Sequence, residues 1–267
     1  MATASAARVV GPLRGAWLRV EGHWTWYRRH WVSTLYSTGL QPVVFLAAMG
    51  LGFGSQVKAG PATGGVPYLV YLAPALLVAG AAQLGIGESS YPVLSGFKWQ
   101  KDYLAVTATP VSPGQVLGGH LIWTTLRLTT AGLVYGLIAL LFGAWPNAGA
   151  LIVVLVGTLT GLACAVLVTA LAAYTFDEGQ RFGLLFRFVL TPMTLFSGTF
   201  FPITQIPVFL RWLAWLSPLW HGTELARAAT LGGLGAGAVL GHLAYLIVLV
   251  LAGWAIAHRG FYRRLVA

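Results

Sequence analysis

The sequence predicts an all-α, polytopic membrane protein with six transmembrane helices. Of the 267 residues, 57% are hydrophobic and only 8% are charged, whereas soluble domains carry about 25% charged residues. The mean hydropathy is +0.77, and the apolar residues fall in long runs. A helix needs about 20 residues to cross about 30 Å of hydrocarbon, and these runs reach that length. A soluble fold of this composition would lack a polar surface.

A basic amphipathic segment precedes the first apolar run. In residues 13–31, aromatic and apolar side chains recur at steps of four and three, and cationic side chains occupy most of the other faces. The aromatic stripe includes Trp17 and Trp24, and Arg28 and Arg29 follow it. This pattern predicts a helix in the cytoplasmic headgroup region, within a cytoplasmic N-terminus of residues 1–31. The alternative is a helix in a small soluble domain, but few residues are present to bury the stripe.

Six apolar runs make up a predicted transmembrane domain of residues 32–257, and a basic tail of residues 258–267 follows it. Their predicted bounds are 32–54, 67–89, 114–142, 148–174, 182–201 and 237–257. Glycines four residues apart, which let helix backbones approach closely, occur in the third and fourth runs. These pairs, Gly132 with Gly136 and Gly157 with Gly161, predict close packing within the bundle.

Basic residues are concentrated on one side of this topology. Twelve of the 16 Lys and Arg residues lie in the N-terminal segment, in the loops after the second and fourth runs, one turn into the fifth run, or in the tail. Only Lys58, Arg211 and Arg227 lie on the opposite side. Because Lys and Arg mark cytoplasmic loops, both termini are predicted to be cytoplasmic, in an inner or plasma membrane. The net charge of +10 then reflects contact with lipid and not with nucleic acid.

The cytoplasmic loop of residues 90–113 mixes aromatic and charged side chains. It contains Phe97, Lys98, Trp99, Lys101, Asp102 and Tyr103. This composition predicts a short helix over residues 95–103, and the prolines at 110 and 113 end it. The alternative is a loop that merely lies at the headgroups, where aromatic residues are common.

The external segment of residues 202–236 follows the fifth run. Residues 207–216 are apolar but too few to cross a membrane, and Ser217 with Pro218 provides an N-cap and first-turn proline for another short helix. Two half-length helices predict a re-entrant pair that caps the bundle or borders a pathway. One turn apart in the second helix, Glu224 and Arg227 are expected to neutralise each other. The candidate gate residues are Phe196, Ser197, Gly198, Phe200, Phe201, Pro202, Pro218, Glu224 and Arg227.

Arg127 is the only charged residue well inside a predicted span. A cation at that depth is costly, so it is expected to face protein or a wet cavity. Two interpretations remain open: contact with an anionic group of a lipid-linked substrate, or pairing with a carboxylate such as Glu88 or with backbone carbonyls. Both residues are therefore pathway candidates.

Catalytic and cofactor motifs are missing from the sequence. No lysine follows a glycine, which excludes the G-x-x-x-x-G-K-[ST] phosphate loop. No HExxH or G-x-S-x-G motif occurs, and no histidine pair has metal-ligand spacing. We therefore predict no catalytic residue, metal site or bound cofactor in this chain. An intramembrane hydrolase or transferase is the alternative from another class, since catalytic groups distant in sequence can meet in space.

The order of these features resembles the type-2 ABC exporter permeases. The resemblance is carried by LAVTATPVSP at residues 104–113, FSGTFFPITQIP at 196–207 and LSPLWHGTELAR at 216–227. Within that family, the chain is most similar to the nodulation-factor and lipooligosaccharide exporter branch. The daunorubicin-resistance permeases are its neighbours.

The resemblance implies a transport subunit that is not itself an enzyme. It would pair with a second permease copy or a homologous permease and dock on two cytoplasmic ATP-binding subunits, which hold Mg-ATP. The family's coupling helix maps to residues 95–103, its interface helix to 13–31 and its re-entrant pair to 202–231. The implied activity is outward movement of an amphipathic glycolipid, lipooligosaccharide or lipid-linked substrate. Multidrug or antibiotic efflux is the alternative within transport.

Overall fold

The computed structural model describes residues 11–29, 32, 40–52, 54, 56–60 and 63–266. Their secondary structure is entirely helical, with no strand among these described residues, as the sequence predicts. The elements in chain order are α1 (Pro12–Arg29), α3 (Gln41–Leu46), η2 (Ala47–Gly52), α4 (Tyr68–Ser89), α5 (Tyr91–Phe97), α6 (Asp102–Thr107), α7 (Pro113–Leu141), α8 (Ala150–Ala173), α9 (Gln180–Leu185), η5 (Phe186–Leu190), α10 (Thr191–Phe196), η6 (Ile203–Gln205), η7 (Val208–Leu210), α11 (Arg211–Leu216), α12 (Pro218–Leu231) and α13 (Ala236–Leu265).

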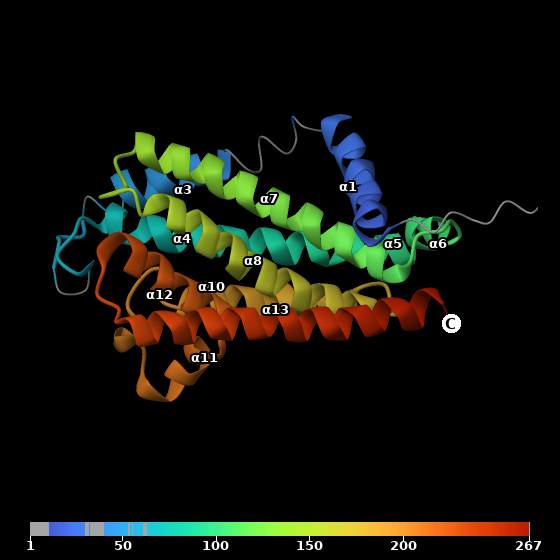
Figure 1. Ribbon diagram of the computed structural model, residues 1–267. Coiled ribbons are helices and arrows are strands. Elements are labelled where there is room, and N and C mark those ends of the chain that lie inside the picture. The colour runs from blue at the N-terminus through green and yellow to red at the C-terminus, as the bar shows by residue number, and fades with distance from the viewer. Residues whose placement is uncertain are drawn as a thin grey trace, which may run out of the picture.

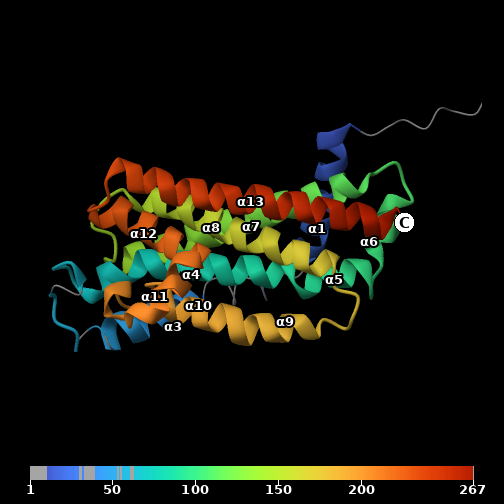
Figure 2. The same cartoon turned by 90° about the horizontal axis from the view of Figure 1, so that it is seen from below.

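Four long helices, α4, α7, α8 and α13, run side by side and form the bundle (Figures 1 and 2). Helices α5 and α6 and the C-terminal end of α13 lie at one end, which we call the α5–α6 end. The N-terminal ends of α4 and α13 lie at the other, the α12 end. Helix α8 contacts α4, α7, α12 and α13. It is apolar around most of its circumference, as expected of a helix surrounded by others.

Glycines allow α4 and α8 to approach at backbone distance. A Cβ added to Gly85 would lie 2.3 Å from the carbonyl oxygen of Gly161, and one added to Gly161 would lie 2.7 Å from that of Ala81. A Cβ on Gly157 would overlap the Leu77 side chain at 2.4 Å. The close packing predicted from the Gly157 and Gly161 pair is therefore confirmed.

Four segments are long and apolar enough to cross a membrane: Tyr68–Phe97, Pro113–Leu141, Ala150–Ala173 and Ala236–Leu265. They match the second, third, fourth and sixth predicted spans. The last is longer than predicted, because α13 continues to Leu265 through most of the tail. Its end is held where Arg264 Nη1 donates hydrogen bonds to the carbonyl oxygens of Ala172, at 3.0 Å, and Thr175, at 2.8 Å.

The first and fifth predicted spans are not among these four. Within residues 32–54, α3 and η2 are helical, while residues 33–39 lie outside the described residues. In the fifth, α9, η5 and α10 follow one another with a π-helical turn in the middle. The helical run ends at Phe196 and not at residue 201 as predicted, because Gly198 adopts the left-handed conformation, φ +80°, which commonly ends helices.

Helix α1 crosses beside α7 near the α5–α6 end (Figure 1). Its buried residues are small or short, Gly15, Ala16 and Val20, and a Cβ on Gly119 of α7 would lie 2.5 Å from the Ala16 carbonyl oxygen. The predicted aromatic stripe faces outward, with Trp17 51% exposed and Trp24 53% exposed. The predicted helix thus exists. It packs against α7 by its small residues and by the rings of His23 and Tyr27, which contact Trp123; Trp31 lies outside the described residues.

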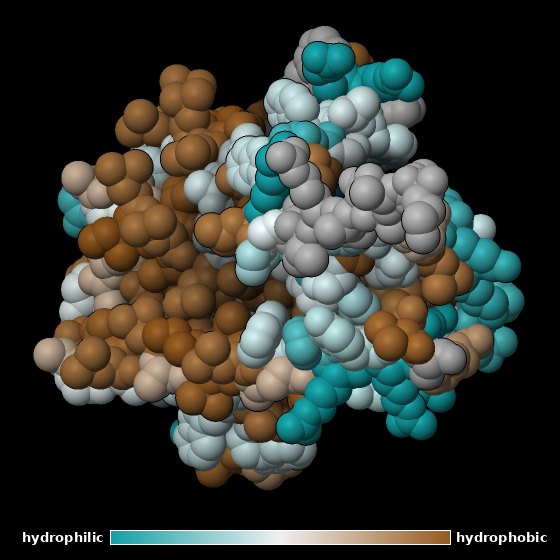
Figure 3. Space-filling model, turned by 45° about the vertical axis from the view of Figure 1, so that its right-hand side comes forward, coloured by the Kyte–Doolittle hydropathy of each residue, from teal (hydrophilic) through white to brown (hydrophobic). Residues whose placement is uncertain are grey.

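The surface divides into an apolar shaft and a polar end. Hydrophobic side chains cover the shaft, and hydrophilic ones gather at the side that carries the α5–α6 end (Figure 3). Exposed leucines occur along α7, at 133, 137 and 141, and along α13, at 240 and 251. Such a continuous apolar surface requires a lipid environment. The protein is therefore a membrane protein.

Candidate functional site

A groove of about 350 Å³ opens along α4. Between Tyr71 and Ser90 this helix is buried except for one stripe, in which Gly80 and Gln83 are exposed and Leu84, Gly87 and Glu88 are half-buried. We call this cavity the α4 groove. It is lined by Phe45, Leu76, Leu77, Ala79, Gly80, Ala81, Gln83, Leu84, Gly87, Glu88, Leu128, Ala131, Gly132, Tyr135, Thr194 and Phe200. Elements α3, α4, α7 and α10 thus meet around it.

The α4 groove has a polar end and an apolar length. From Leu76 to Glu88 the stripe runs about 18 Å at 1.5 Å per residue. Leucine, alanine and glycine line most of this length, and Glu88 lies toward the α5–α6 end. The hydroxyl of Tyr135 donates to the carbonyl oxygen of Ala73 at 3.0 Å and is thereby occupied. Gln83 and Glu88 are left as the polar groups of α4 that face the cavity.

Arg127 and Glu88 form an ion pair, with Arg127 Nη2 3.2 Å from Glu88 Oε1. The Arg127 Cζ also lies 5.1 Å from the centroid of the Tyr27 ring on α1. Of the two charged residues, Glu88 lines the groove and Arg127 does not. The pairing interpretation of Arg127 therefore agrees with the structure, and the carboxylate, backed by the guanidinium, is what the groove presents to a ligand.

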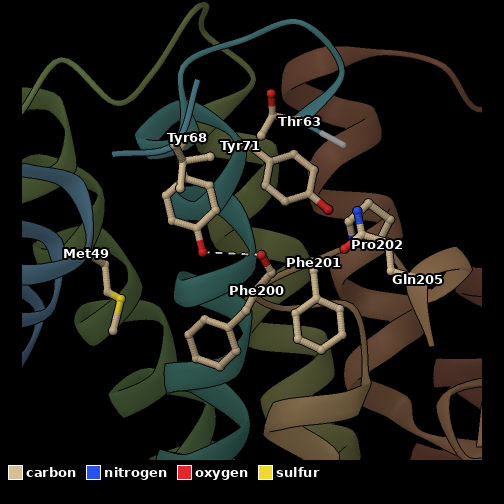
Figure 4. A pocket seen from close by; sticks show the side chains of 9 residues that line it. Met49, Thr63, Tyr68, Tyr71, Phe200, Phe201, Pro202 and Gln205 are labelled. Carbon is tan, nitrogen blue, oxygen red and sulfur yellow. Dashed lines mark hydrogen bonds between the residues drawn. The ribbon is translucent and has the colours of Figure 1, made fainter. Parts of the chain in front are cut away.

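A second cavity of about 370 Å³, the outer cavity, lies toward the α12 end (Figure 4). Its lining is Met49, Val57, Thr63, Tyr68, Tyr71, Phe200, Phe201, Pro202 and Gln205. The Tyr68 hydroxyl donates to the carbonyl oxygen of Phe200 at 3.3 Å, the dashed line in Figure 4. Phe200 lines both cavities. It therefore stands where the outer cavity and the α4 groove approach each other.

Hydroxyl groups hold the segment before α12 in place. The Ser197 Oγ donates to the Ser217 Oγ at 2.7 Å, and the Ser217 Oγ accepts from the backbone N–H of Leu219 at 3.2 Å. Ser217 is the N-cap and Pro218 is the first residue of α12. Both local predictions are confirmed. The two short helices of the predicted pair are η7 with α11 and then α12.

Arg227 does not form the predicted pair with Glu224: no ion pair joins these two residues within 4.0 Å, although both are described. Arg227 is buried. Its Nη2 donates to the carbonyl oxygen of Thr199 at 3.1 Å, and its Cζ lies 3.9 Å from the centroid of the Tyr71 ring. Tertiary contacts to the segment after α10 and to α4 thus replace the expected local neutralisation.

At the α5–α6 end, Glu178 connects the loop after α8 to the loop after α5. Its Oε1 lies 2.6 Å from Lys98 Nζ, and its Oε2 accepts a hydrogen bond from Trp99 Nε1 at 2.9 Å. Hydrogen bonds from Lys98 and from Trp99 hold the pKa of the Glu178 carboxyl below its usual value. All three side chains are at the surface, where ion pairs are weak and screened by salt.

The predicted helix over residues 95–103 is two helices. α5 ends at Phe97, α6 begins at Asp102, and Lys101 between them is left-handed at φ 55°. The break lets Tyr103 turn into the core, where its ring lies 4.9 Å from that of Phe97. Burial raises the pKa of the Tyr103 hydroxyl to about 12.

Asp102 of the same loop contacts α1. Its Oδ2 lies 2.7 Å from Arg19 Nη2, and the Arg19 Cζ lies 4.9 Å from the centroid of the Tyr103 ring. Among the predicted coupling residues, Phe97 and Tyr103 are buried, whereas Trp99 and Lys101 are exposed. Only the exposed ones are accessible to a cytoplasmic partner.

A catalytic or metal site is not evident in the described part of the chain. Ser89 Oγ lies 3.4 Å from His120 Nε2, but these residues are 0% and 2% exposed, so a substrate cannot reach the serine. His221 and His242 approach to 2.8 Å between their Nδ1 atoms. No group of three His, Cys, Asp or Glu residues is arranged to hold a metal ion among the described residues.

Sequence reasoning missed several cavity residues, in particular Gln83, Thr194, Tyr68 and Tyr71. A signal for Gln83 was present, since it is an amide within an apolar run, five residues before Glu88. The tyrosines gave no such signal because aromatic residues near a span end are common. The predicted groups also remain separate: the loop residues lie at the α5–α6 end, and Phe200 and Arg227 lie with the outer cavity and its surroundings.

The chain is similar to known proteins over most of its length. Residues 17–231 match the family model described as ABC-2 type transporter. The chain is 30% identical over 221 residues to nodulation protein J of Rhizobium leguminosarum bv. viciae, which covers 81% of this chain and 82% of that protein. Nodulation protein J of Sinorhizobium fredii is 29% identical over 240 residues, covering 84% of this chain and 88% of that protein.

A more distant relative belongs to Escherichia coli K12. The inner membrane transport permease YadH is 25% identical to this chain over 225 residues, covering 81% of this chain and 84% of the permease. The matched family region begins within α1 and ends at the last residue of α12. It includes both cavities.

Proposed function

This chain belongs to the ABC-2 type transporter family, and from that premise we propose that it is the permease subunit of an ATP-driven exporter. The proposed cargo is an amphipathic glycolipid, lipooligosaccharide or other lipid-linked molecule, moved outward across the membrane. The α4 groove is the observation that carries this proposal. It is apolar for most of its length and ends at Gln83 and Glu88, which suits a molecule with an acyl chain and a polar head.

The topology we propose has six spans and two cytoplasmic termini. In it, α3 with η2 belongs to the first span, and the run from α9 to α10 forms the fifth. The α5–α6 end is cytoplasmic, because it carries Lys98 and Lys101 and the C-terminal Arg263 and Arg264, and the positive-inside rule assigns such clusters to the cytoplasm. Helix α12 and the outer cavity then lie on the external side. The relative YadH is named as an inner membrane transport permease, which favours the same membrane for this chain.

ATP hydrolysis is assigned to a separate subunit, since the sequence excludes a phosphate loop of its own. We place the docking surface at the α5–α6 end, on the exposed side chains of Trp99, Lys101 and Leu104. Two ATP-binding subunits and a second permease would complete the exporter. The nodulation protein J relatives favour the lipooligosaccharide branch over drug efflux.

Reconstitution tests the proposed function. The chain would be co-purified with its ATP-binding subunit, placed in proteoliposomes, and supplied with a fluorescent glycolipid and Mg-ATP. We expect ATP-dependent appearance of the glycolipid in the leaflet opposite to the ATP-binding subunit. A catalytically inactive ATP-binding subunit is the matched control. Movement that continues with that control rejects ATP-driven export, and movement of a fluorescent drug but not of the glycolipid would favour efflux.

A further inference from the structure

The α4 groove has glycines and polar side chains among its mostly apolar lining. On α4, the groove stripe contains two glycines, Gly80 and Gly87, on either side of Gln83. A Cβ added to either glycine meets no atom within 4 Å. Other glycines of this bundle, such as Gly85, are required for close approach of a neighbouring helix. Gly80 and Gly87 make no such helix contact. They widen the groove beside its polar side chains.

Hydrogen-bonding capacity at the polar end is dominated by acceptors. The ion pair with Arg127 engages Glu88 Oε1, and the Glu88 side chain remains 24% exposed. A carboxylate has about four lone-pair sites, so Glu88 keeps free capacity to accept hydrogen bonds while paired. Gln83 adds a carbonyl oxygen with two lone pairs and an amide group with two N–H donors. The two side chains are five residues apart, about 7.5 Å along the helix axis and about 140° around it, so they flank the groove stripe on its two sides.

Electrostatics select among polar head groups. An anionic head would meet the carboxylate first, because Arg127 lies behind Glu88 on the side of Tyr27. A cationic head would find a carboxylate whose charge the guanidinium already compensates, so its gain in Coulomb energy is small. A neutral head rich in hydroxyls meets no charge repulsion and donates hydrogen bonds to the carboxylate. Hydrogen bonds to charged acceptors are stronger than hydrogen bonds to neutral ones.

We propose that the α4 groove is a binding site for a neutral, hydroxyl-bearing head group attached to an acyl chain, with Glu88 and Gln83 as the residues that determine specificity. The head lies at the α5–α6 end of the groove, and the chain extends along Gly80 toward Leu76 and Phe200. This inference rests on the proposed function and deepens it. It assigns Arg127 a positioning role: the guanidinium pairs with Glu88 and orients it, and does not contact the head.

Photolabelling of the full chain in phosphatidylcholine nanodiscs tests this assignment. Three probes share one diazirine-bearing alkyl chain and differ in the head: a glucoside, a phosphate and a primary ammonium. Labelled peptides are identified by mass spectrometry. We expect the glucoside to label peptides of α4, α7 or α10 and to be displaced by unlabelled alkyl glucoside, and the other two heads to label them weakly. Equal labelling by the phosphate probe would overturn the proposal.

Variants separate the roles of the groove residues. Gly80→Leu adds a side chain to the groove at a position where an added Cβ meets no atom within 4 Å, so labelling by the glucoside should be lost. Gly237→Leu, at an equally open position on α13, should leave labelling unchanged. Glu88→Gln should reduce glucoside labelling about tenfold, the effect of losing a hydrogen bond to a charged group. The same change should increase phosphate labelling, because Arg127 is then uncompensated. An unchanged preference between the two heads would refute the role of Glu88.

The two proposals fail in different experiments. Photolabelling needs no ATP-binding subunit, so lost ATP-dependent export with retained glucoside labelling rejects the exporter and keeps the site. Retained export by Gly80→Leu, with labelling elsewhere, rejects the site and keeps the exporter. If Gly80→Leu does not give a monodisperse protein, Gln83→Leu takes its place, because Gln83 is exposed to the groove, and unchanged labelling in that variant counts against the site.

Discussion

The α12 end and the α5–α6 end of the bundle are held together by different interactions. Near the α12 end, buried hydroxyls and a buried guanidinium bond to neighbouring hydroxyl and carbonyl oxygens, as Ser197 does with Ser217 and Arg227 with Thr199. At the α5–α6 end, ion pairs of partly exposed side chains join the loops to one another and to α1. The first kind is insulated from solvent, and the second is weakened by salt and acid.

This difference suits the exporter proposed above, in which an ATP-binding subunit would dock at the α5–α6 end. At the α12 end, the bonding side chains of Ser197 and Arg227 are buried. At the α5–α6 end, the charged side chains lie at the surface, where they can exchange partners at low cost. Four predictions test the comparison.

Arg227→Met is expected to have the largest effect. It leaves the Thr199 carbonyl without its cationic donor and removes the contact with the Tyr71 ring, which should cost about 3 kcal/mol of unfolding free energy. The thermal unfolding midpoint in detergent is the measurement. Arg211→Met is the matched control, since Arg211 is half-buried and donates only within its own segment, to Ile206 and Thr204. Equal midpoints for Arg227→Met and wild type would contradict the comparison.

Asp102→Lys comes next, because it replaces the ion pair with Arg19 by a repulsion. We expect a loss of about 1 kcal/mol, seen as faster hydrogen exchange in α1, together with weaker assembly with the ATP-binding subunit. Lys101→Glu, at an exposed position one residue away, should weaken assembly while leaving exchange in α1 unchanged. The double exchange Arg19→Asp with Asp102→Arg should restore protection of α1. Failure of that rescue would show that the pair does not hold α1.

Acid should loosen the contact between Glu178 and the loop after α5. The folded pKa of Glu178 is lowered by its hydrogen bonds from Lys98 and Trp99. Its contribution is therefore present above the ordinary glutamate pKa of about 4.3 and is lost as the pH falls through the lower folded value. Hydrogen exchange in residues 174–182 should rise in this window. Glu178→Gln should abolish the pH step, and a step of the same size in that variant would assign it to another group.

Cysteine labelling should have the smallest effect on the protein, because it only reports sidedness. Lys58 and Lys101 are both exposed, and Cys164, the single native cysteine, is buried. A membrane-impermeant maleimide should react with Lys58→Cys in intact cells and with Lys101→Cys only after permeabilisation. External labelling of Lys101→Cys would reverse the proposed orientation of the two ends.

Local sequence signals were sufficient to predict the four long helices and the start of α12. Long apolar runs predicted four helices to within a few residues at most of their ends, because a span must satisfy its own backbone hydrogen bonds and bury its side chains in lipid. Ser217 with Pro218 predicted the start of α12 because capping depends only on adjacent residues. The glycine spacing of Gly157 and Gly161 predicted close helix contact for the same local reason.

Contacts between residues far apart in the sequence decided how the side chains around the cavities and at the α5–α6 end are placed. Arg227 lies one turn from Glu224, yet it binds Thr199 and Tyr71, which are 28 and 156 residues away. The indoles of Trp17 and Trp24 on α1 are exposed, whereas α7 packs against the small residues of α1, since Gly119 admits backbone contact there, and against the ring of Tyr27. Burial of Tyr103 beside Phe97 broke the predicted helix at Lys101.

The sequence by itself determined that this chain is an all-helical membrane protein, that it lacks a phosphate loop and that its basic residues gather on one side. Each of these conclusions follows from the amino-acid composition, from the spacing of apolar residues or from short runs of neighbouring residues. Only the tertiary structure decided that Glu88 faces the α4 groove while Arg127 stands behind it, and that Phe200 borders two cavities. The physical reason is that a cavity is the space left between helices, and its lining depends on how distant segments pack against one another.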